Sequence, residues 1–291
     1  MPTRAPLQIF VMGILAGVYI GFGSLLMLSC GGNCPGLASA NPGLKAILSG
    51  LFGLPCGLLL VMIAGAELFT GNTALVTAAV LEKRASFGQL AKSWLMSYTG
   101  NFVGSFALAA AAVYAGLFAV NPAATAAASA KTSLTFGQVR TTCSHHGFVP
   151  RVLLTPHPRT RSSVFPPRLP ACDRNCACLR EPRGPERTQA FVRGVLCNWL
   201  VCLAIWMATA VTTLPGKALA ILFPISAFIS IGLEHSVANM FIIPAGILAG
   251  APVTWSQYLM ANLLPVTLGN TFAGAVCVAF AYYTVYGKLD R

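Results

Sequence analysis

Long runs without charged residues dominate the chain and predict helices that cross a membrane. Such runs cover residues 5–44, 46–66, 93–130, 194–216 and 236–287. A helix needs about 20 apolar residues to cross a bilayer core of about 30 Å, and several of the runs are long enough. We therefore predict an all-α integral membrane fold with six spans. They lie near residues 7–29, 46–81, 90–120, 191–213, 219–249 and 256–286.

Two of these spans carry an acidic residue inside an apolar run. Residues 218–233 are uncharged, and this segment gives roughly 24 Å of helix, which is short of a full crossing. Glu234 and His235 would then lie inside the membrane, and a second half-helix could begin at Pro244. The second span is expected to break in the same way near Glu67. Irregular backbone at this depth needs protein or a water-filled cavity around it.

The two halves of the chain resemble one another. SYTGNFVGS at residues 97–105 is similar to PVTLGNTFAGA at residues 265–275. Glu67 precedes Asn101 by 34 residues, and Glu234 precedes Asn270 by 36. Three spans followed by three similar spans must have opposite orientations, because an odd number of crossings inverts the second half. The sequence therefore predicts an inverted repeat, with residues 1–138 and 190–291 as its two halves.

The formal charge of +12 is unevenly distributed, which argues against a nucleic-acid partner. Residues 139–189 contain nine arginines and three acidic residues. Elsewhere the basic residues follow the positive-inside pattern if both termini face the cytoplasm. That side would hold Arg4, Lys83, Arg84, Lys92, Lys217, Lys288 and Arg291, and the far side Lys45, Lys131 and Arg193. The expected surroundings are lipid, in the plasma membrane or in an organelle envelope such as that of a plastid.

Four motifs, in order along the chain, closely resemble the formate/nitrite transporter family. They are AELFTGNT at residues 66–73, GVLCNWLVCLAIW at 194–206, EHSVANMFIIP at 234–244 and NLLPVTLGN at 262–270. The resemblance implies an aquaporin-like six-helix protomer with broken second and fifth spans, one pore per protomer and a homopentamer. It also implies passage of small monovalent anions such as formate and nitrite, often coupled to a proton, without enzymatic activity or a cofactor.

The resemblance assigns roles to individual residues. His235 resembles the family's central pore histidine, and Thr70 resembles the threonine of the mobile loop in the second span. Asn198 and Asn270 resemble polar residues near that centre, and Lys131 resembles a vestibule lysine. The pore is expected to narrow on one side at Leu54, Leu58 and Phe69, and on the other side at Val201 and Phe228.

The ionisable residues inside the spans have a chemistry of their own. Such groups commonly mark pathways, and an unperturbed imidazole titrates near about pH 6.5, so His235 could donate to an anion or exchange a proton with it. Glu67 and Glu234 are expected to accept hydrogen bonds from unwound backbone N–H groups and so to pin each loop. Lys131 could be a solvated loop residue, or it could attract anions to the pore mouth.

Residues 139–189 depart from the family pattern. Deleting this segment joins Gln138 to Ala190, as the family pattern requires. The segment begins with valine, whose codons start with GT, and ends with glutamine, one of whose codons ends with AG. We interpret it as translated intron sequence in a eukaryotic gene. The alternatives are a disordered loop, or a small metal site built from Cys172, Cys176, Cys178, His145, His146 and His157.

Two other functions remain open on the residues alone. The first is an aquaporin-like channel for water or neutral solutes, although the chain lacks paired Asn-Pro-Ala motifs. The second is a membrane enzyme or redox protein that uses cysteines and histidines, although the predicted spans offer no plausible ligand set.

Overall fold

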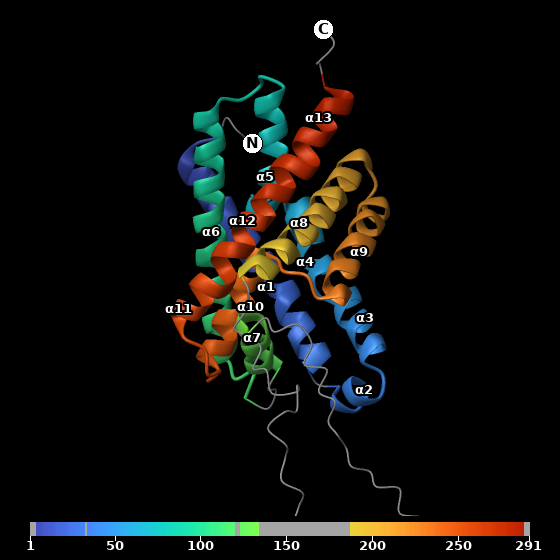
Figure 1. Cartoon of the computed structure of the whole chain (residues 1–291), viewed down its shortest axis with the longest axis vertical. Coiled ribbons are helices and arrows are strands. Elements are labelled where there is room, and N and C mark those ends of the chain that lie inside the picture. Colours follow the sequence, from blue (N-terminus) through green and yellow to red (C-terminus); the bar gives the residue numbers. More distant parts are fainter. Residues whose placement is uncertain (1–3, 33, 120–122, 134–186, 288–291) are drawn as a thin grey trace, which may run out of the picture. The chain divides into compact units, whose positions relative to one another are not determined.

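The computed structural model describes residues 4–32, 34–119, 123–133 and 187–287, where the regular elements are all helices (Figure 1). The first half contains α1 (Pro6–Gly32), α2 (Pro35–Ala40), α3 (Pro42–Phe52), α4 (Leu54–Ala64), α5 (Phe69–Leu81), α6 (Phe87–Tyr114) and α7 (Ala123–Ser133). The second half contains α8 (Arg187–Ala210), α9 (Leu214–Ile231) and α10 (Ser236–Leu248). Its last helix consists of α11 (Trp255–Gln257), η2 (Tyr258–Leu263), α12 (Leu264–Phe272), η3 (Ala273–Phe280) and α13 (Ala281–Tyr286), where η marks π-helical turns.

Several of these helices have the length and composition of membrane spans. The described segments that qualify are Pro6–Cys30, Pro42–Ala64, Arg187–Ala210, Leu214–Ile231 and Trp255–Tyr286. The helices α5 and α10 are apolar but have only 13 residues each, about 20 Å of helix. In the described residues, the prediction of an all-helical fold with apolar helices of membrane length is therefore confirmed.

The breaks predicted near Glu67 and Glu234 are present. Gly65 ends α4 and Gly232 ends α9, each with a positive φ (72° and 82°) that glycine adopts without steric cost. Each glycine lies two residues before the glutamate of its break. The prediction that the second half-helix of span 5 begins at Pro244 is wrong, because α10 begins at Ser236 and contains Pro244. Polar side chains bind the first N–H groups of α10, so the helix needs no proline to begin.

The predicted connections are more helical than the sequence pattern indicates. Between the first two predicted spans, Pro35 and Pro42 each open a helix, since the first helical position needs no backbone N–H. The helix α7 was not predicted at all. Of the predicted insert, residues 139–186 lie outside the described residues, as do its candidate metal ligands. Its last three residues form the start of α8.

Glycines bring the long helices into close contact. A Cβ at Gly17 would collide with the backbone of Asn101, and one at Gly104 with the backbone of Ile14, so α1 and α6 touch through their main chains. The helices α8 and α12 meet in the same way through Gly269 and the backbone of Phe191. These contacts hold the long helices around the breaks.

Gly104→Ala is expected to lower the thermal unfolding midpoint of the purified protein. The added methyl group meets backbone atoms that cannot move aside, and such overpacking costs about 1–3 kcal/mol. Gly43→Ala in α3 is the matched control, because a Cβ there meets no atom within 4 Å. Equal midpoints for the two variants in a detergent melt would contradict the contact.

Candidate pore centre

The starts of α5 and α10 meet at Thr70 and His235. Thr70 Oγ1 lies 2.9 Å from Nε2 of His235, and both side chains are buried. His235 is the N-cap of α10, where its Nδ1 accepts a hydrogen bond from the backbone N–H of Ala238 at 3.1 Å. A neutral imidazole whose Nδ1 accepts carries its hydrogen on Nε2, so His235 donates to Thr70. The Thr70 hydroxyl then keeps its own hydrogen for another acceptor.

Asn198 of α8 fixes the backbone next to Thr70. Its Nδ2 donates to the carbonyl oxygen of Thr70 at 3.2 Å, to Oγ1 of Thr73 at 3.1 Å and to the carbonyl oxygen of Asn270 at 2.6 Å. The thiol of Cys202 also donates to the Thr70 carbonyl, at 3.6 Å. Asn198 therefore lies at the predicted centre, where it ties the first turn of α5 to α12.

Asn101 of α6 holds the first break. Its Oδ1 accepts from the backbone N–H of Phe69 at 2.9 Å, and its Nδ2 donates to the carbonyls of Gly13 at 2.8 Å and Glu67 at 2.9 Å. The first N–H of a helix has no partner within that helix, so Asn101 satisfies a group that burial would otherwise make costly. One side chain thus joins α6, α1 and the start of α5.

Asn270 of α12 holds the second break with the same set of bonds. Its Oδ1 accepts from the backbone N–H of Ser236 at 2.8 Å, and its Nδ2 donates to the carbonyls of Gly194 at 2.8 Å and Glu234 at 3.1 Å. The side chain of Asn270, which was predicted at the pore centre, thus forms its hydrogen bonds with backbone groups. It positions the start of α10, and with it the ring of His235.

The carboxylate of Glu67 is paired with charged and amide groups. It accepts from Nη1 of Arg4 at 2.8 Å and from Nδ2 of Asn72 at 2.8 Å, and its side chain is 1% exposed. The expectation that it binds unwound backbone N–H groups is wrong, because Asn101 takes the N–H of Phe69. A buried carboxylate needs a charged partner, and Arg4 supplies it.

Glu234 has a matching set of partners in the other half. Its carboxylate accepts from Nζ of Lys131 at 3.1 Å through both oxygens, from Nδ2 of Asn239 at 2.7 Å and from Nδ2 of Asn262 at 3.2 Å. The expectation that Glu234 binds unwound backbone N–H groups is also wrong, because Asn270 binds the N–H of Ser236. Lys131 is therefore neither a freely solvated loop residue nor an unpaired cation.

A wide cavity and a narrow one meet at His235. The wide cavity measures about 640 Å³, and its lining includes Lys45 and Lys131. The narrow cavity measures about 10 Å³, which is close to the smallest space that holds one water molecule. Its lining residues are Ile20, Leu54, Leu58, Leu68, Val201, Ile225, Phe228 and His235. Leu54, Phe228 and His235 line both cavities, so the imidazole lies where the wide space becomes an apolar neck.

Four of the five predicted narrowing residues come together in this neck: Leu54, Leu58, Val201 and Phe228. They were expected on two sides of the pore, but they surround one cavity. Phe69 does not line it, and its ring packs edge-on against Tyr98 at 4.9 Å between ring centroids. The reason is that Asn101 ties the backbone of Phe69 to α6, and the preceding residue, Leu68, lines the neck instead.

Sequence reasoning missed the partners of the two glutamates. The missed residues are Arg4 and Asn72 at the Glu67 carboxylate, and Asn239 and Asn262 at the Glu234 carboxylate. One signal was available, because Asn72 follows Glu67 by five positions and Asn239 follows Glu234 by five positions. Arg4 lies 63 residues from Glu67, and no local pattern indicates that pairing.

Membrane-length helices surround two helix breaks, and the polar contact between the breaks separates a wide cavity from an apolar neck. These features define a membrane transport protein of the broken-helix class. The chain belongs to the formate/nitrite transporter family, since the model of the family described as "Formate/nitrite transporter" matches residues 2–142 and 179–284. The internal gap in this match, residues 143–178, lies within the predicted insert.

Relatives and solved structures agree with this family. The chain is 40% identical to "Probable formate transporter" of Methanothermobacter thermautotrophicus, over 99% of this chain and 92% of the relative. It is 32% identical to "Nitrite transporter NirC" of Salmonella typhimurium, over 100% of this chain and 88% of the relative. A solved "Pentameric formate channel with formate bound" shares 26% identity and a TM-score of 0.72, over 97% of each chain. The chain is thus a multi-pass integral membrane protein of a family of channels and transporters.

Proposed function

We propose that this chain carries small monovalent anions of the formate and nitrite type across a membrane, through a pore in each protomer. The observation that carries the proposal is the contact between Thr70 and His235 at the boundary between the wide cavity and the neck. Two relatives are called a formate transporter and a nitrite transporter, which supports the same substrates.

At this contact, an anion meets hydrogen-bond donors that do not carry a full positive charge. Because His235 donates to Thr70, the Thr70 hydroxyl can donate to an anion oxygen. The first turn of α5 adds partial positive charge from its helix dipole. Lys131, which lines the wide cavity, attracts anions but is largely neutralised by Glu234. Conduction needs sites that bind weakly enough to release the ion, and this arrangement provides one.

The apolar neck favours passage of the substrate as a neutral acid. Its eight lining residues include one polar side chain, that of His235. An anion that enters such surroundings loses hydration, so a weak acid is favoured there in its protonated form. The apolar neck itself would then couple transport of the substrate to transport of a proton. A neck of about 10 Å³ also favours the smallest acids.

The finer architecture is part of the proposal: six spans in two inverted halves, both termini in the cytoplasm, and a homopentamer. The matched hydrogen bonds of Asn101 and Asn270, and of Glu67 and Glu234, support the repeat. Figure 1 shows α2 and α7 at one end of the described unit and the α5–α6 connection at the other, as the sorting of basic residues requires. The solved pentameric channel supports the oligomer.

Residues 139–189 are proposed to be translated intron sequence that the working transporter lacks. The family model leaves residues 143–178 unmatched, which supports an insertion at this place. Sequencing transcripts across the region tests the idea, and a dominant message that retains the segment would overturn it.

Uptake into liposomes tests the function directly. Liposomes that contain the purified protein should take up labelled formate and nitrite faster than empty liposomes. Uptake should be faster at lower external pH, because more of each acid is then protonated. Glycerol and water should show little protein-dependent flux. Rapid glycerol or water flux without formate flux would favour an aquaporin-like channel and overturn the proposal.

Leu58→Ala is expected to relax the selection for small acids. Leu58 is 1% exposed and lines the neck, so its truncation widens the narrowest space. The ratio of acetate uptake to formate uptake should rise about fivefold, since removing buried methyl groups changes discrimination by about 1–3 kcal/mol. Leu60→Ala, on the exposed face of the same helix, should leave the ratio unchanged. An unchanged ratio in Leu58→Ala would show that Leu58 does not limit the size of the acids that pass the neck.

A further inference from the structure

Two polar side chains of α3 line the wide cavity at some distance from the pore centre. Lys45 and Ser49 both belong to its lining, and they are four residues apart, so they share one face of the helix. Lys45 precedes the end of α3 at Phe52 by seven residues, and Ser49 precedes it by three, which corresponds to roughly 10 Å and 5 Å of helix. The neck residue Leu54 follows directly after this helix. The two side chains therefore lie at successive depths on the way to the neck.

The ammonium group of Lys45 is an unpaired cation. It has no hydrogen-bond or ion-pair partner in the described part of the chain, and no acidic residue is among the described residues that line the wide cavity. Lys131, in contrast, binds both carboxylate oxygens of Glu234. Lys45 is also the fourth residue of α3, where the partial positive charge of the helix start disfavours a lysine. Helix stability therefore gives no reason for a lysine at this position.

The hydroxyl group of Ser49 is also without a partner. Its Oγ is buried, and it makes no hydrogen bond within the described residues. A buried polar group without a partner is costly, and a ligand in the cavity could supply one. The helix is held in place from α9, because Ser226 donates to the carbonyl of Gly50 at 3.2 Å. Ser230 likewise donates to the carbonyl of Ala46 at 3.3 Å, so the opposite face of α3 is fixed and Ser49 stays toward the cavity.

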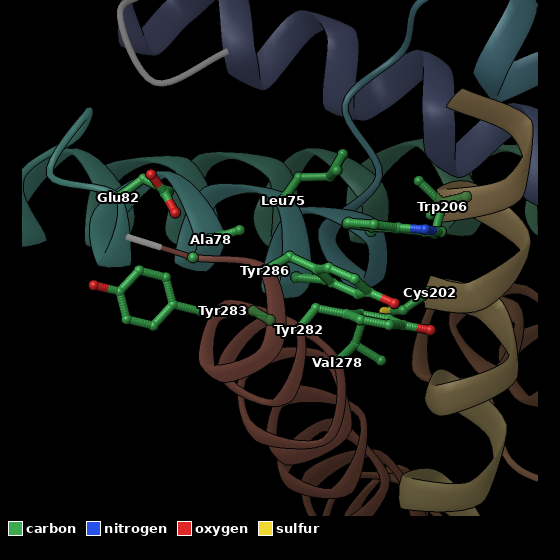
Figure 2. A pocket seen from close by; sticks show the side chains of 14 residues that line it. Leu75, Ala78, Glu82, Cys202, Trp206, Val278, Tyr282, Tyr283 and Tyr286 are labelled. Carbon is green, nitrogen blue, oxygen red and sulfur yellow. The ribbon is translucent and has the colours of Figure 1, made fainter. Parts of the chain in front are cut away.

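The cavity of about 210 Å³ beside α5 has the opposite charge (Figure 2). Glu82 is the one charged residue among its described lining residues. A carboxylate repels anions, so this cavity is unsuited to them. None of its lining residues also lines the wide cavity. Among the cavities described here, the wide one is therefore where an anion meets an unpaired cation.

We propose that Lys45 and Ser49 form an outer binding site for a small monovalent anion, which holds the substrate before it moves on to Thr70 and His235. The inference rests on the proposed function. The ammonium group draws the anion into the cavity, and the Ser49 hydroxyl donates to one of its oxygens. Lys45 is only partly buried, so water weakens the attraction and lets the anion leave for the neck. Lys131 keeps its role as the charged partner of Glu234.

The formate concentration that gives half-maximal uptake into liposomes tests the site. Lys45→Gln should raise this concentration about three- to tenfold, since a unit charge close to an anion in a partly solvated cavity has an effect of that size. The maximal rate should change little, because the residue collects substrate without touching the pore centre. The difference should shrink at high salt, which screens the charge. Lys45→Arg keeps the charge and should behave like the unaltered chain.

Two further variants complete the test. Ser49→Ala should raise the half-maximal concentration about threefold, through loss of one hydrogen bond to the anion. Lys83→Gln removes the same charge as Lys45→Gln but lies in the α5–α6 connection, at the other end of the described unit in Figure 1, and should have no effect. Lys45→Gln and Ser49→Ala should both unfold at the temperature of the unaltered chain, because neither side chain has a partner to lose.

The outcomes separate this site from the proposed function. If the unaltered chain takes up formate and Lys45→Gln has the same half-maximal concentration, the outer site is overturned and the proposed function stands. A lower unfolding temperature for Lys45→Gln would show that Lys45 has a structural partner, and it would also overturn the site. If the unaltered chain takes up no more formate than empty liposomes do, the proposed function fails, and the outer site fails with it.

Discussion

His235→Phe is expected to reduce formate and nitrite uptake by at least about tenfold. The variant keeps a planar ring of similar size but removes the donor to Thr70 Oγ1 and the acceptor for the N–H of Ala238. The boundary between the wide cavity and the neck then becomes wholly apolar on that side. Without the imidazole, nothing fixes the Thr70 hydroxyl as a donor to the anion. A hydrogen bond to an ion is worth about 1.5–3 kcal/mol, which corresponds to a rate effect of about ten- to a hundredfold. Uptake of labelled formate into liposomes measures it.

Three further variants separate the transport role of the imidazole from its structural role. His235→Asn keeps a side-chain acceptor for the first turn of α10 but is too short to replace the imidazole against Thr70, so it should fold normally and transport poorly. Thr70→Ser keeps the hydroxyl and should keep most of the uptake, whereas Thr70→Val should lose it. If His235→Phe is well folded and its uptake is unchanged, the imidazole plays no part in transport.

The breaks could be predicted from sequence because they depend on local features. Glu67 and Glu234 each interrupt an apolar run two residues after a glycine that ends a helix. A carboxylate inside a bilayer is costly on an unbroken lipid-facing helix, so its position already indicates protein surroundings. Polarity and glycine therefore locate the break without any knowledge of what surrounds it.

The partners at each break could not be predicted in the same way. The hydrogen bonds from Asn101 to Gly13 and from Arg4 to Glu67 join residues 88 and 63 positions apart. A sequence pattern shows that backbone N–H groups are left free at a break, but not which side chain approaches them. Either Glu67 or Asn101 could have bound the free N–H group at the first break. The packing of α6 against α1 brings Asn101 to it.

The constriction shows a further limit. Leu68 and Phe69 are adjacent, and the resemblance to the family pointed to Phe69 alone. In the structure Leu68 keeps an extended backbone before α5, while Phe69 is the first helical residue and faces α6. The neck is therefore lined by Leu68 and not by its neighbour Phe69.

Asn101→Leu is expected to cause a large loss of stability. Leucine has nearly the same volume but leaves the N–H of Phe69 and the carbonyl of Glu67 without partners in a buried site. Each buried unsatisfied group costs about 1–3 kcal/mol, so the folded state should lose about 3 kcal/mol or more. Thermal unfolding of the purified protein in detergent measures the change. Uptake should fall as well, because Thr70 lies one residue after the freed N–H.

Comparison with two other variants shows whether the loss comes from the break. Ser105→Ala removes one hydrogen bond from α6 to the carbonyl of Gly17, which is inside α1, so it should cost only about 1 kcal/mol. Asn270→Leu frees the N–H of Ser236 and the carbonyl of Glu234, and it should match Asn101→Leu in size, since the two asparagines make the same bonds. If Asn101→Leu unfolds at the same temperature as Ser105→Ala, the break is held by the ion pair of Glu67 with Arg4 rather than by the asparagine.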